Sequence, residues 1–435
     1  MLRLEARIIG GANMRRIAAL LLLIVVMVVS GCRSNINQEQ STYAQWDGWP
    51  GFDAGKLESV QLENTTWDSG RCEATSENTV IETENGYYYV HQQYLFYADK
   101  TDMDKWVLVC SKPDCNHRSG ENCGAFINGE KIVSHKGRLC TTVRSDVYPE
   151  LYEKRFPGYL LISLDSRGAN PQLEYVLEEA VGTNTSCHLS YLSSDHWLYY
   201  FSDFGIDGSC TGYLYKISEK GAQLIKEQKD FQGSGLYAMT GLAYGVTPFW
   251  SDMLDESGEL RYFHYFDGED MKVLDLSKLP SWGCYVSSGI ARGFDHRNGY
   301  YHDVNLETGE DIKLADAQIN NSFACVILPN CILESTMLRS FSVDLREAGT
   351  VNAMKLFDGV QWKDVILPEE LANASANEYL EVIAVTSDRI LLSLRNASTY
   401  KHQYNYPSTL CQIILTSGSL ELEICGEIEM PKQVG

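Results

Sequence analysis

Three cysteines and one histidine within a short stretch are the residues of this 435-residue sequence best suited to chemistry. The stretch reads VCSKPDCNHRSGENCGAF over residues 109–126, and Cys110, Cys115, His117 and Cys123 have the spacing C-x4-C-x-H-x5-C. Three thiolates and an imidazole can complete the tetrahedral shell of a structural zinc ion, with no position left for a substrate water. The residues therefore predict a structural zinc site in a loop that a bound metal could help to fold.

Two other interpretations of these cysteines stay open. The sequence has 13 cysteines, and in an exported chain Cys110 or Cys123 could form a disulfide with Cys72 or Cys140. Cysteines within apolar runs, such as Cys325 in FACVIL and Cys411, are typical of buried packing residues. The cluster could in the same way consist of packing and turn residues.

The N-terminus has the parts of an export signal in their usual order. Met14 and two arginines precede an apolar run over residues 17–29, which is too short to span a membrane comfortably. The Val-Ser-Gly-Cys sequence that ends at Cys32 resembles the lipobox of bacterial lipoproteins. The resemblance implies that residues 1–31 are a signal peptide, for which Met14 could be the true start, and that Cys32 is lipidated and becomes the mature N-terminus. Residues 32–56 are polar and contain Gly and Pro, which predicts a flexible tether.

The charge of the chain bears on its partners. The formal net charge is −22, and removing residues 1–31, with four Arg and one Glu, would leave −25. A surface this acidic repels phosphate backbones, which argues against nucleic acid as a partner. Apart from the signal, the sequence has no apolar run of spanning length, so lipid on Cys32 is the membrane attachment that we expect.

Short β-branched or aromatic runs alternate with polar turns along residues 57–435 and predict an all-β fold. One element, strand then D/S/E-x-x-G turn then strand, recurs at residues 159–177, 213–225, 301–314 and 411–425. Its glycine suits a tight hairpin because glycine adopts positive φ without penalty. A second strand pair precedes most copies, which gives four strands in each unit.

Four-stranded units that recur every 40 to 60 residues predict a β-propeller of about seven blades, with six or eight as alternatives. Two β-sandwiches are the main competing fold. Residues 57–62 could form a strand that closes the ring against the last blade, and residues 368–380 are the best helix candidate. The predicted blades begin near Thr79, Lys131, Cys187, Leu236, Tyr285, Phe323 and Tyr379.

A lipobox, a tyrosine-rich repeat chain and the motif L-x-C-x-K-P-D-C-x-H-x-x-x-x-x-C together resemble β-propeller lipoproteins of gut Clostridia that carry domains of unknown function. The resemblance implies a propeller anchored outside the cytoplasm, on the outer face of the cell membrane, and implies no activity. The residues that match the motif are Leu108, Cys110, Lys112, Pro113, Asp114, Cys115, His117 and Cys123.

The sequence contains no G-x-S-x-G, H-E-x-x-H or Gly-rich phosphate-loop motif, and we predict no catalytic residue and no cofactor other than zinc. Residues 293–303 gather five ionisable side chains in GFDHRNGYYHD, but neighbours on a strand face opposite sides, so we expect a solvated hairpin. The function that we expect is a binding module for a glycan, a peptide or an envelope protein. An envelope assembly scaffold, or a hydrolase or lyase acting at the propeller mouth, are the alternatives.

Overall fold

The chain is described here from a computed structural model. The predicted signal peptide, Cys32 and the tether over residues 32–56 lie outside the described residues. The residues that the structure describes are 57, 60–62, 80–110, 112, 115, 117, 123–127, 132–151, 159–177, 185–193, 196–204, 210–218, 221–228, 262–266, 271–275, 285–287, 290–295, 298–305, 308–319, 325–328, 331–338, 351–396 and 408–428.

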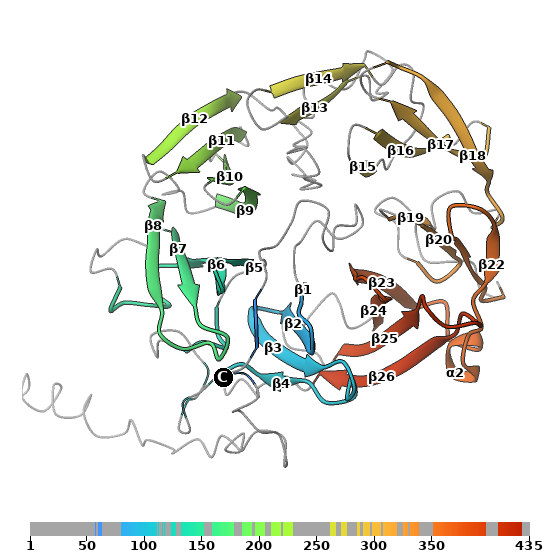
Figure 1. Ribbon diagram of the computed structural model, residues 1–435, viewed down its shortest axis with the longest axis horizontal. Helices are drawn as coiled ribbons and strands as arrows, with labels where there is room; N and C mark the ends of the chain where they lie inside the picture. The colour runs from blue at the N-terminus through green and yellow to red at the C-terminus, as the bar shows by residue number, and fades with distance from the viewer. Residues whose placement is uncertain are drawn as a thin grey trace, which may run out of the picture. The chain divides into compact units, whose positions relative to one another are not determined.

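The described part of the chain is all-β, and its strands form seven antiparallel sheets, six with four strands and one with two (Figure 1). In every sheet the strands lie side by side in chain order. The first two sheets contain β1 (Val80–Glu82), β2 (Gly86–His91), β3 (Tyr94–Asp99), β4 (Val107–Leu108), and β5 (Val133–His135), β6 (Arg138–Arg144), β7 (Tyr159–Leu164), β8 (Gln172–Leu177). The next two contain β9 (Thr185–Ser193), β10 (His196–Phe204), β11 (Cys210–Ser218), β12 (Gly221–Gln228), and β13 (Tyr262–Phe266), β14 (Met271–Asp275). The last three contain β15 (Tyr285–Ser287), β16 (Ile290–Asp295), β17 (Tyr300–Asn305), β18 (Asp311–Asp316); β19 (Cys325–Ile327), β20 (Ile332–Ser335), β21 (Met354–Phe357), β22 (Trp362–Asp364); and β23 (Glu378–Val385), β24 (Arg389–Asn396), β25 (Ser408–Ile414), β26 (Leu422–Ile428).

The sheets begin close to the positions that the repeat pattern predicts. Six of the seven predicted beginnings lie within two residues of the first residue of an observed sheet. The seventh, Leu236, lies outside the described residues, and the nearest sheet downstream begins at Tyr262. The prediction of four strands in each unit is confirmed for six sheets. One short helix, α2 (Glu369–Ala372), lies in the segment predicted as the best helix candidate.

A shared irregularity also marks the sheets as copies of one unit. In four of them the pairing between the third and fourth strands skips one residue of the fourth strand, which makes a β-bulge. A bulge twists an outer strand and hinders pairing of its free edge with another chain. The skipped residues are Glu174, Ile225, Leu314 and Cys425.

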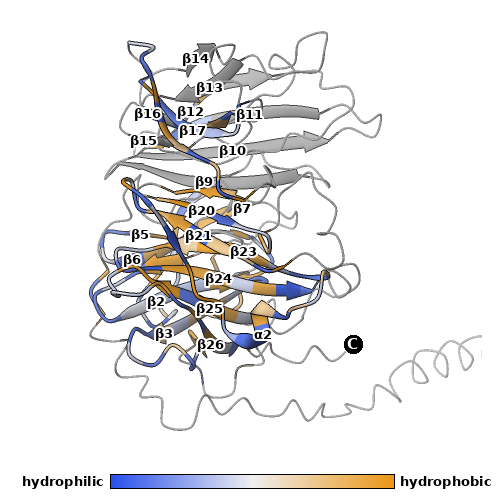
Figure 2. Ribbon diagram, turned by 90° about the vertical axis from the view of Figure 1, so that its right-hand side faces the viewer, coloured by the Kyte–Doolittle hydropathy of each residue, from blue (hydrophilic) through white to orange (hydrophobic). Residues whose placement is uncertain are grey.

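Apolar side chains from neighbouring sheets share common cores. One cluster joins the β19–β22 and β23–β26 sheets, and another joins β1–β4 and β5–β8. Figure 2 shows hydrophobic colour along strands of these sheets and hydrophilic colour at many connecting loops. Leu57 and Val60 belong to the second cluster, and the Leu57 carbonyl accepts a hydrogen bond from Ser166 in the β7–β8 turn. The strand predicted over residues 57–62 is not found at the described residues of that segment, 57 and 60–62: Val60 N donates to the Leu57 carbonyl, and both side chains pack on the first two sheets.

Hydrogen bonds also tie neighbouring sheets together. Tyrosine hydroxyls and backbone groups make these contacts at three junctions between successive sheets. The Tyr88 hydroxyl donates to the Ser166 carbonyl at 2.7 Å, between the first two sheets. The Tyr301 hydroxyl donates to Glu334 at 2.8 Å, and Leu380 N donates to the Met337 carbonyl at 2.7 Å, which connects the last three sheets in chain order.

The first and last sheets contact each other through a charged junction. The Tyr87 hydroxyl on β2 donates to Asp388, in the β23–β24 turn, at 3.0 Å. The backbone N and the hydroxyl of Ser387 both donate to the Glu82 carboxylate. Burial opposes ionisation of Asp388, but hydrogen bonds from Arg389 and Tyr87 lower its pKa to about 2. The carboxylate at this junction is therefore charged at neutral pH.

The helical content of the described residues bears on membrane attachment. None of the described helical segments has the length and the hydropathy that a membrane crossing requires.

Candidate metal centre

The cysteine–histidine loop leaves the β1–β4 sheet and returns to the same strand. Val109, just past β4, donates its N–H to the Leu95 carbonyl of β3 at 2.9 Å. After the loop, the Ala125 carbonyl accepts from the Leu95 N–H at 2.8 Å. Cys110 follows the first contact and Cys123 precedes the second, so pairing with one strand brings the two ends of the motif together.

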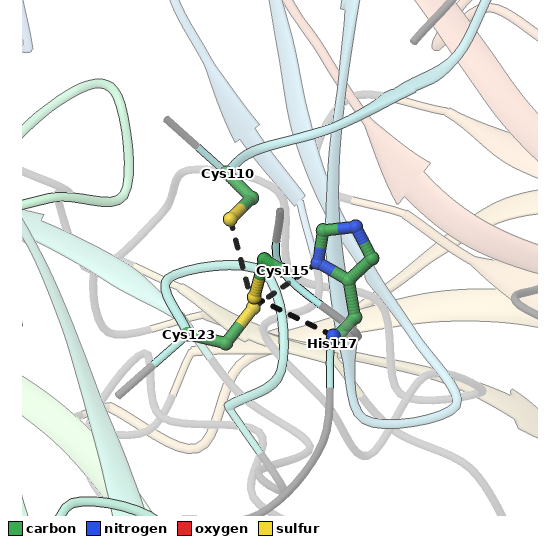
Figure 3. A group of neighbouring side chains, drawn as sticks. All are labelled: Cys110, Cys115, His117 and Cys123. Atoms are coloured by element: carbon green, nitrogen blue, oxygen red, sulfur yellow. Dashed lines mark hydrogen bonds between the residues drawn. The ribbon is translucent and has the colours of Figure 1, made fainter. Parts of the chain in front are cut away.

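The four predicted ligands converge. Their ligand atoms all lie within 4.8 Å of one another, so this group could hold a metal ion. Figure 3 shows the four side chains pointing toward one another. The Cys123 Sγ lies 3.8 Å from the Cys110 Sγ and 3.2 Å from the His117 Nδ1. The backbone N of His117 lies 3.4 Å from the Cys115 Sγ.

These separations suit tetrahedral zinc. Zinc–sulfur bonds of about 2.3 Å at a tetrahedral angle place two sulfurs about 3.8 Å apart. The separation between Cys110 and Cys123 has that value. A zinc–nitrogen bond of about 2.0 Å places nitrogen and sulfur about 3.5 Å apart, a few tenths of an ångström more than between His117 and Cys123. The donor set and its spacing thus fit a structural zinc ion with only a small adjustment.

The pKa values of the thiols in the cluster are shifted in different directions. Hydrogen bonds from Cys115 and Cys123 lower the pKa of the Cys110 thiol to about 3. Hydrogen bonding to Cys110 and Cys115, together with burial, raises the pKa of Cys123. The hydrogen bonds within the cluster therefore favour the thiolate form of Cys110 and oppose that of Cys123, the most buried of the three. A bound divalent cation would take the place of those protons, because thiolates and not thiols ligate metals.

The backbone of the loop is held in an unusual conformation at its histidine. His117 has a φ of 52°, in the left-handed region that costs a non-glycine residue about 1–2 kcal/mol. Its side chain is nevertheless buried, with 8% of the residue exposed, and its Nδ1 contacts Cys123. The buried contact offsets the backbone cost and turns the imidazole into the cluster.

A close contact between two glycines fixes the loop against the next sheet. A Cβ on Gly124 would overlap the carbonyl of Gly168, and a Cβ on Gly168 would overlap the carbonyl of Val109. Gly168 also has a φ of 68° in the β7–β8 turn. The sequence predicts a turn glycine there, but the contact with Gly124 gives it a second role that the repeat pattern does not reveal.

Tyr148 is a further supporting residue that the sequence does not identify. It is fully buried, and its hydroxyl donates to the Cys123 carbonyl at 2.8 Å. Tyr148 follows β6, so the bond connects the loop to the β5–β8 sheet. A tyrosine in a chain with 26 tyrosines carries no signal that would single it out.

The competing disulfide interpretation receives no support from the eight cysteines whose side chains the structure describes, because none of these eight forms a disulfide. Cys140 is buried next to the Arg138 carbonyl, and burial raises the pKa of its thiol to about 12. Cys72 lies outside the described residues. The prediction that Cys411 packs in the core is confirmed at 0% exposure, whereas Cys325 is only partly buried.

The second polar cluster, in the β16–β17 hairpin, does not form a single site. Asp295 is 1% exposed and His302 is fully buried, so the prediction of a solvated hairpin is wrong for both. The prediction that these residues do not all converge is confirmed for the described ones, because Asp303 faces the opposite side of the hairpin from Asp295 and His302. His296 and Arg297 lie outside the described residues. The pairs are Asp295 with Asn298, His302 with Asp311 at 2.9 Å, and Arg292 with Asp303 at 2.8 Å.

Comparisons with known proteins add little to this description. No protein-family model and no curated protein sequence matches the chain. Among solved structures it is similar to Sqt1 of Saccharomyces cerevisiae, with 12% identity over 86% of this chain and 89% of that chain and a TM-score of 0.36. It is also similar to TolB of Acinetobacter baumannii (12%, 79% and 80%, TM-score 0.26) and to apo AztD of Citrobacter koseri (10%, 79% and 74%, TM-score 0.21). TM-scores this low carry nothing about fold or activity over to this chain, so the fold description depends on the sheets themselves.

Proposed function

We propose that this chain is a lipid-anchored, extracytoplasmic β-propeller that serves as a binding module for a glycan, a peptide or an envelope protein. The observation that carries the proposal is the direct contact between the first and last described sheets, through Tyr87 and Asp388. Closure of this kind makes a rigid scaffold whose loops are free to vary, and binding residues concentrate on such loops. The lipobox at Cys32 would direct the chain to the membrane, and the tether would hold the propeller away from the membrane surface.

The contact pattern between sheets supports the propeller rather than two β-sandwiches. In a propeller each blade contacts its two neighbours in chain order, and the last contacts the first. The described junctions follow that order, and the shared bulge in the fourth strand supports one repeated unit. We propose seven blades, the fourth of which includes β13 and β14.

Anchoring and binding are tested together in cells of a lipoprotein-producing bacterium. The parent and Cys32→Ser are expressed with an alkyne fatty acid, and we expect lipid label and membrane recovery only for the parent. The purified chain without residues 1–32 is then applied to arrays of envelope polysaccharides and peptidoglycan fragments. Retention of one glycan class supports the binding module. Label on Cys32→Ser contradicts the anchor, and hydrolysis of an arrayed glycan favours the enzyme alternative.

We further propose that Cys110, Cys115, His117 and Cys123 bind one structural zinc ion that ties the β1–β4 sheet to the β5–β8 sheet. Support comes from the convergence of four suitable ligand atoms within 4.8 Å. The hydrogen bond from Tyr148 and the contact between Gly124 and Gly168 connect the metal-binding loop to the second sheet, so a bound metal would also stabilise the contact between the two sheets.

The metal proposal is tested by elemental analysis of protein purified without oxygen. We expect one zinc per chain in the parent and almost none in the Cys115→Ser/His117→Ala variant. Cys140→Ser is the matched control, because Cys140 is a buried thiol close in sequence but not part of the cluster. Metal near zero in the parent, or equal in parent and double variant, contradicts the site.

A further inference from the structure

Two features of the cysteine cluster bear on oxidation as well as on metal binding. Two of its sulfurs, on Cys110 and Cys123, lie 3.8 Å apart, so they can form a disulfide if each moves by about 0.9 Å toward the usual bond length. Cys110 is partly exposed, whereas Cys123 is fully buried. An external reagent can therefore reach one member of the pair and not the other.

Four other described cysteines contrast with this arrangement. Cys140, Cys331, Cys411 and Cys425 are each less than 9% exposed. A disulfide reagent needs access to a sulfur, so these thiols are protected by the core. Cys325, which is partly buried, is the exception outside the cluster among the cysteines whose side chains the structure describes.

We propose that the metal centre is a reversible redox switch, in which an external disulfide oxidises Cys110 and Cys123 to a disulfide and releases the metal. The proposal rests on the zinc site proposed above and concerns its regulation. The reduced, metal-bound loop and the oxidised, metal-free loop are the two states. The oxidant is a protein or small-molecule disulfide.

The chemistry balances in two exchange steps. The Cys110 thiolate attacks one sulfur of the external disulfide, which forms a mixed disulfide and releases one external thiolate. The Cys123 thiolate then attacks the Cys110 Sγ, which forms the internal disulfide and releases the second external thiolate. The two protein sulfurs lose two electrons, the external disulfide gains them, and solvent protonates both released thiolates.

Loss of two of four ligands explains release of the metal. Cys115 and His117 alone leave a structural zinc ion half coordinated, and such sites are four-coordinate. Cys123 also connects to the next sheet, because its carbonyl accepts from Tyr148, and its Sγ accepts from the Phe126 N–H at 3.3 Å beside the first sheet. Movement of Cys123 toward Cys110 therefore changes the junction between the first two sheets.

The experiment uses the metal-loaded chain prepared without oxygen, with zinc measured first. Oxidised glutathione is added, released zinc is followed with a chromogenic chelator, and disulfides are mapped by mass spectrometry. We expect one equivalent of zinc to be released together with one Cys110–Cys123 disulfide, and dithiothreitol with added zinc to restore the starting state. Cys110→Ser should form no internal disulfide, while Cys140→Ser should behave as the parent.

The outcomes separate the two proposals. Absence of zinc before oxidant contradicts the metal centre, and with it the switch. Zinc that is present but stays bound while glutathione is consumed contradicts the switch alone. A disulfide mapped to another pair, or release that dithiothreitol and zinc do not reverse, also contradicts the switch and leaves the zinc site intact.

Discussion

The cysteine–histidine loop and the β16–β17 hairpin both gather polar, ionisable residues within a short stretch of sequence, yet only the loop brings them to one point. In the loop, four ligand atoms lie within 4.8 Å of one another. In the hairpin, His302 contacts Asp311 and Asp303 contacts Arg292, as separate pairs. The number of suitable residues in a stretch therefore says little about a site until the backbone between them is known.

The difference has a simple structural cause. Successive residues on a strand face opposite sides, so His302 and Asp303 must point apart. Cys115 and His117 lie outside the strands and so are not bound by that alternation, and the residues at both ends of the loop pair with the same β3 strand. A positive φ at His117 adds the change in direction that turns its imidazole inward.

Replacing one polar residue in each region should have the largest effect and the sharpest contrast. We expect Cys123→Ser to lose its zinc completely, because Cys123 is the central sulfur of the cluster. His302→Ala should leave the metal content unchanged. Elemental analysis measures the metal, and chemical denaturation with and without a chelator measures stability.

Two further results would sharpen or break that contrast. The chelator should destabilise the parent by about as much as Cys123→Ser does, and should not destabilise Cys123→Ser further. A loss of zinc in His302→Ala would show that the two regions are coupled and would contradict their separation.

Glycine substitutions compare how tightly the two regions are packed. Gly124→Ala should cost about 3 kcal/mol, because the added methyl overlaps the Gly168 backbone, which cannot move without shifting its turn. Gly299→Ala, in the hairpin turn, should cost only about 1–2 kcal/mol, since it has a φ of 71° but open space around its Cβ position. Urea denaturation measures both, and equal costs would contradict the close contact at Gly124.

Much of the architecture could be predicted from the sequence, because each unit encodes it locally. The glycine of the D-S-R-G turn needs its positive φ, and alternating apolar residues mark the strands on either side, so the beginnings of six sheets followed from the pattern. The four members of the cluster were also predictable, because they are unusual residue types at short spacing.

Contacts between distant residues were not predictable in this way. The pairing of Gly124 with Gly168, the bond from Tyr148 to Cys123 and the packing of Leu57 on the first two sheets all depend on how the sheets meet. Burial of Asp295 and His302 was missed because the polar composition of the hairpin indicates solvent, and composition does not show that His302 pairs with Asp311 on the next strand.

Charge removal within the hairpin should distinguish its two pairs. Arg292 and Asp303 form a two-pronged ion pair with side chains 18% and 17% exposed, and Asp303→Asn should cost about 1–3 kcal/mol. Asp311 is 44% exposed where it contacts His302, and Asp311→Asn should cost less than about 1 kcal/mol. Thermal denaturation of the two variants measures the difference, and the reverse order would contradict independent pairs.

The smallest effect concerns pH and the contact that the hairpin makes with the next sheet. Burial raises the pKa of Glu334 above its usual 4.5, although the Tyr301 hydroxyl and the Ile319 N–H, which both donate to it, favour the charged form. A raised folded-state pKa means that the folded protein binds a proton more tightly than the unfolded chain does. The contribution of Glu334 is therefore fully present below pH 4.5 and is lost as the pH rises through its folded pKa. The difference in unfolding free energy between the parent and Glu334→Gln, measured by urea denaturation from pH 4 to pH 8, should shift against the parent as the pH rises, and a shift in the opposite direction would mean that the hydrogen bonds outweigh burial.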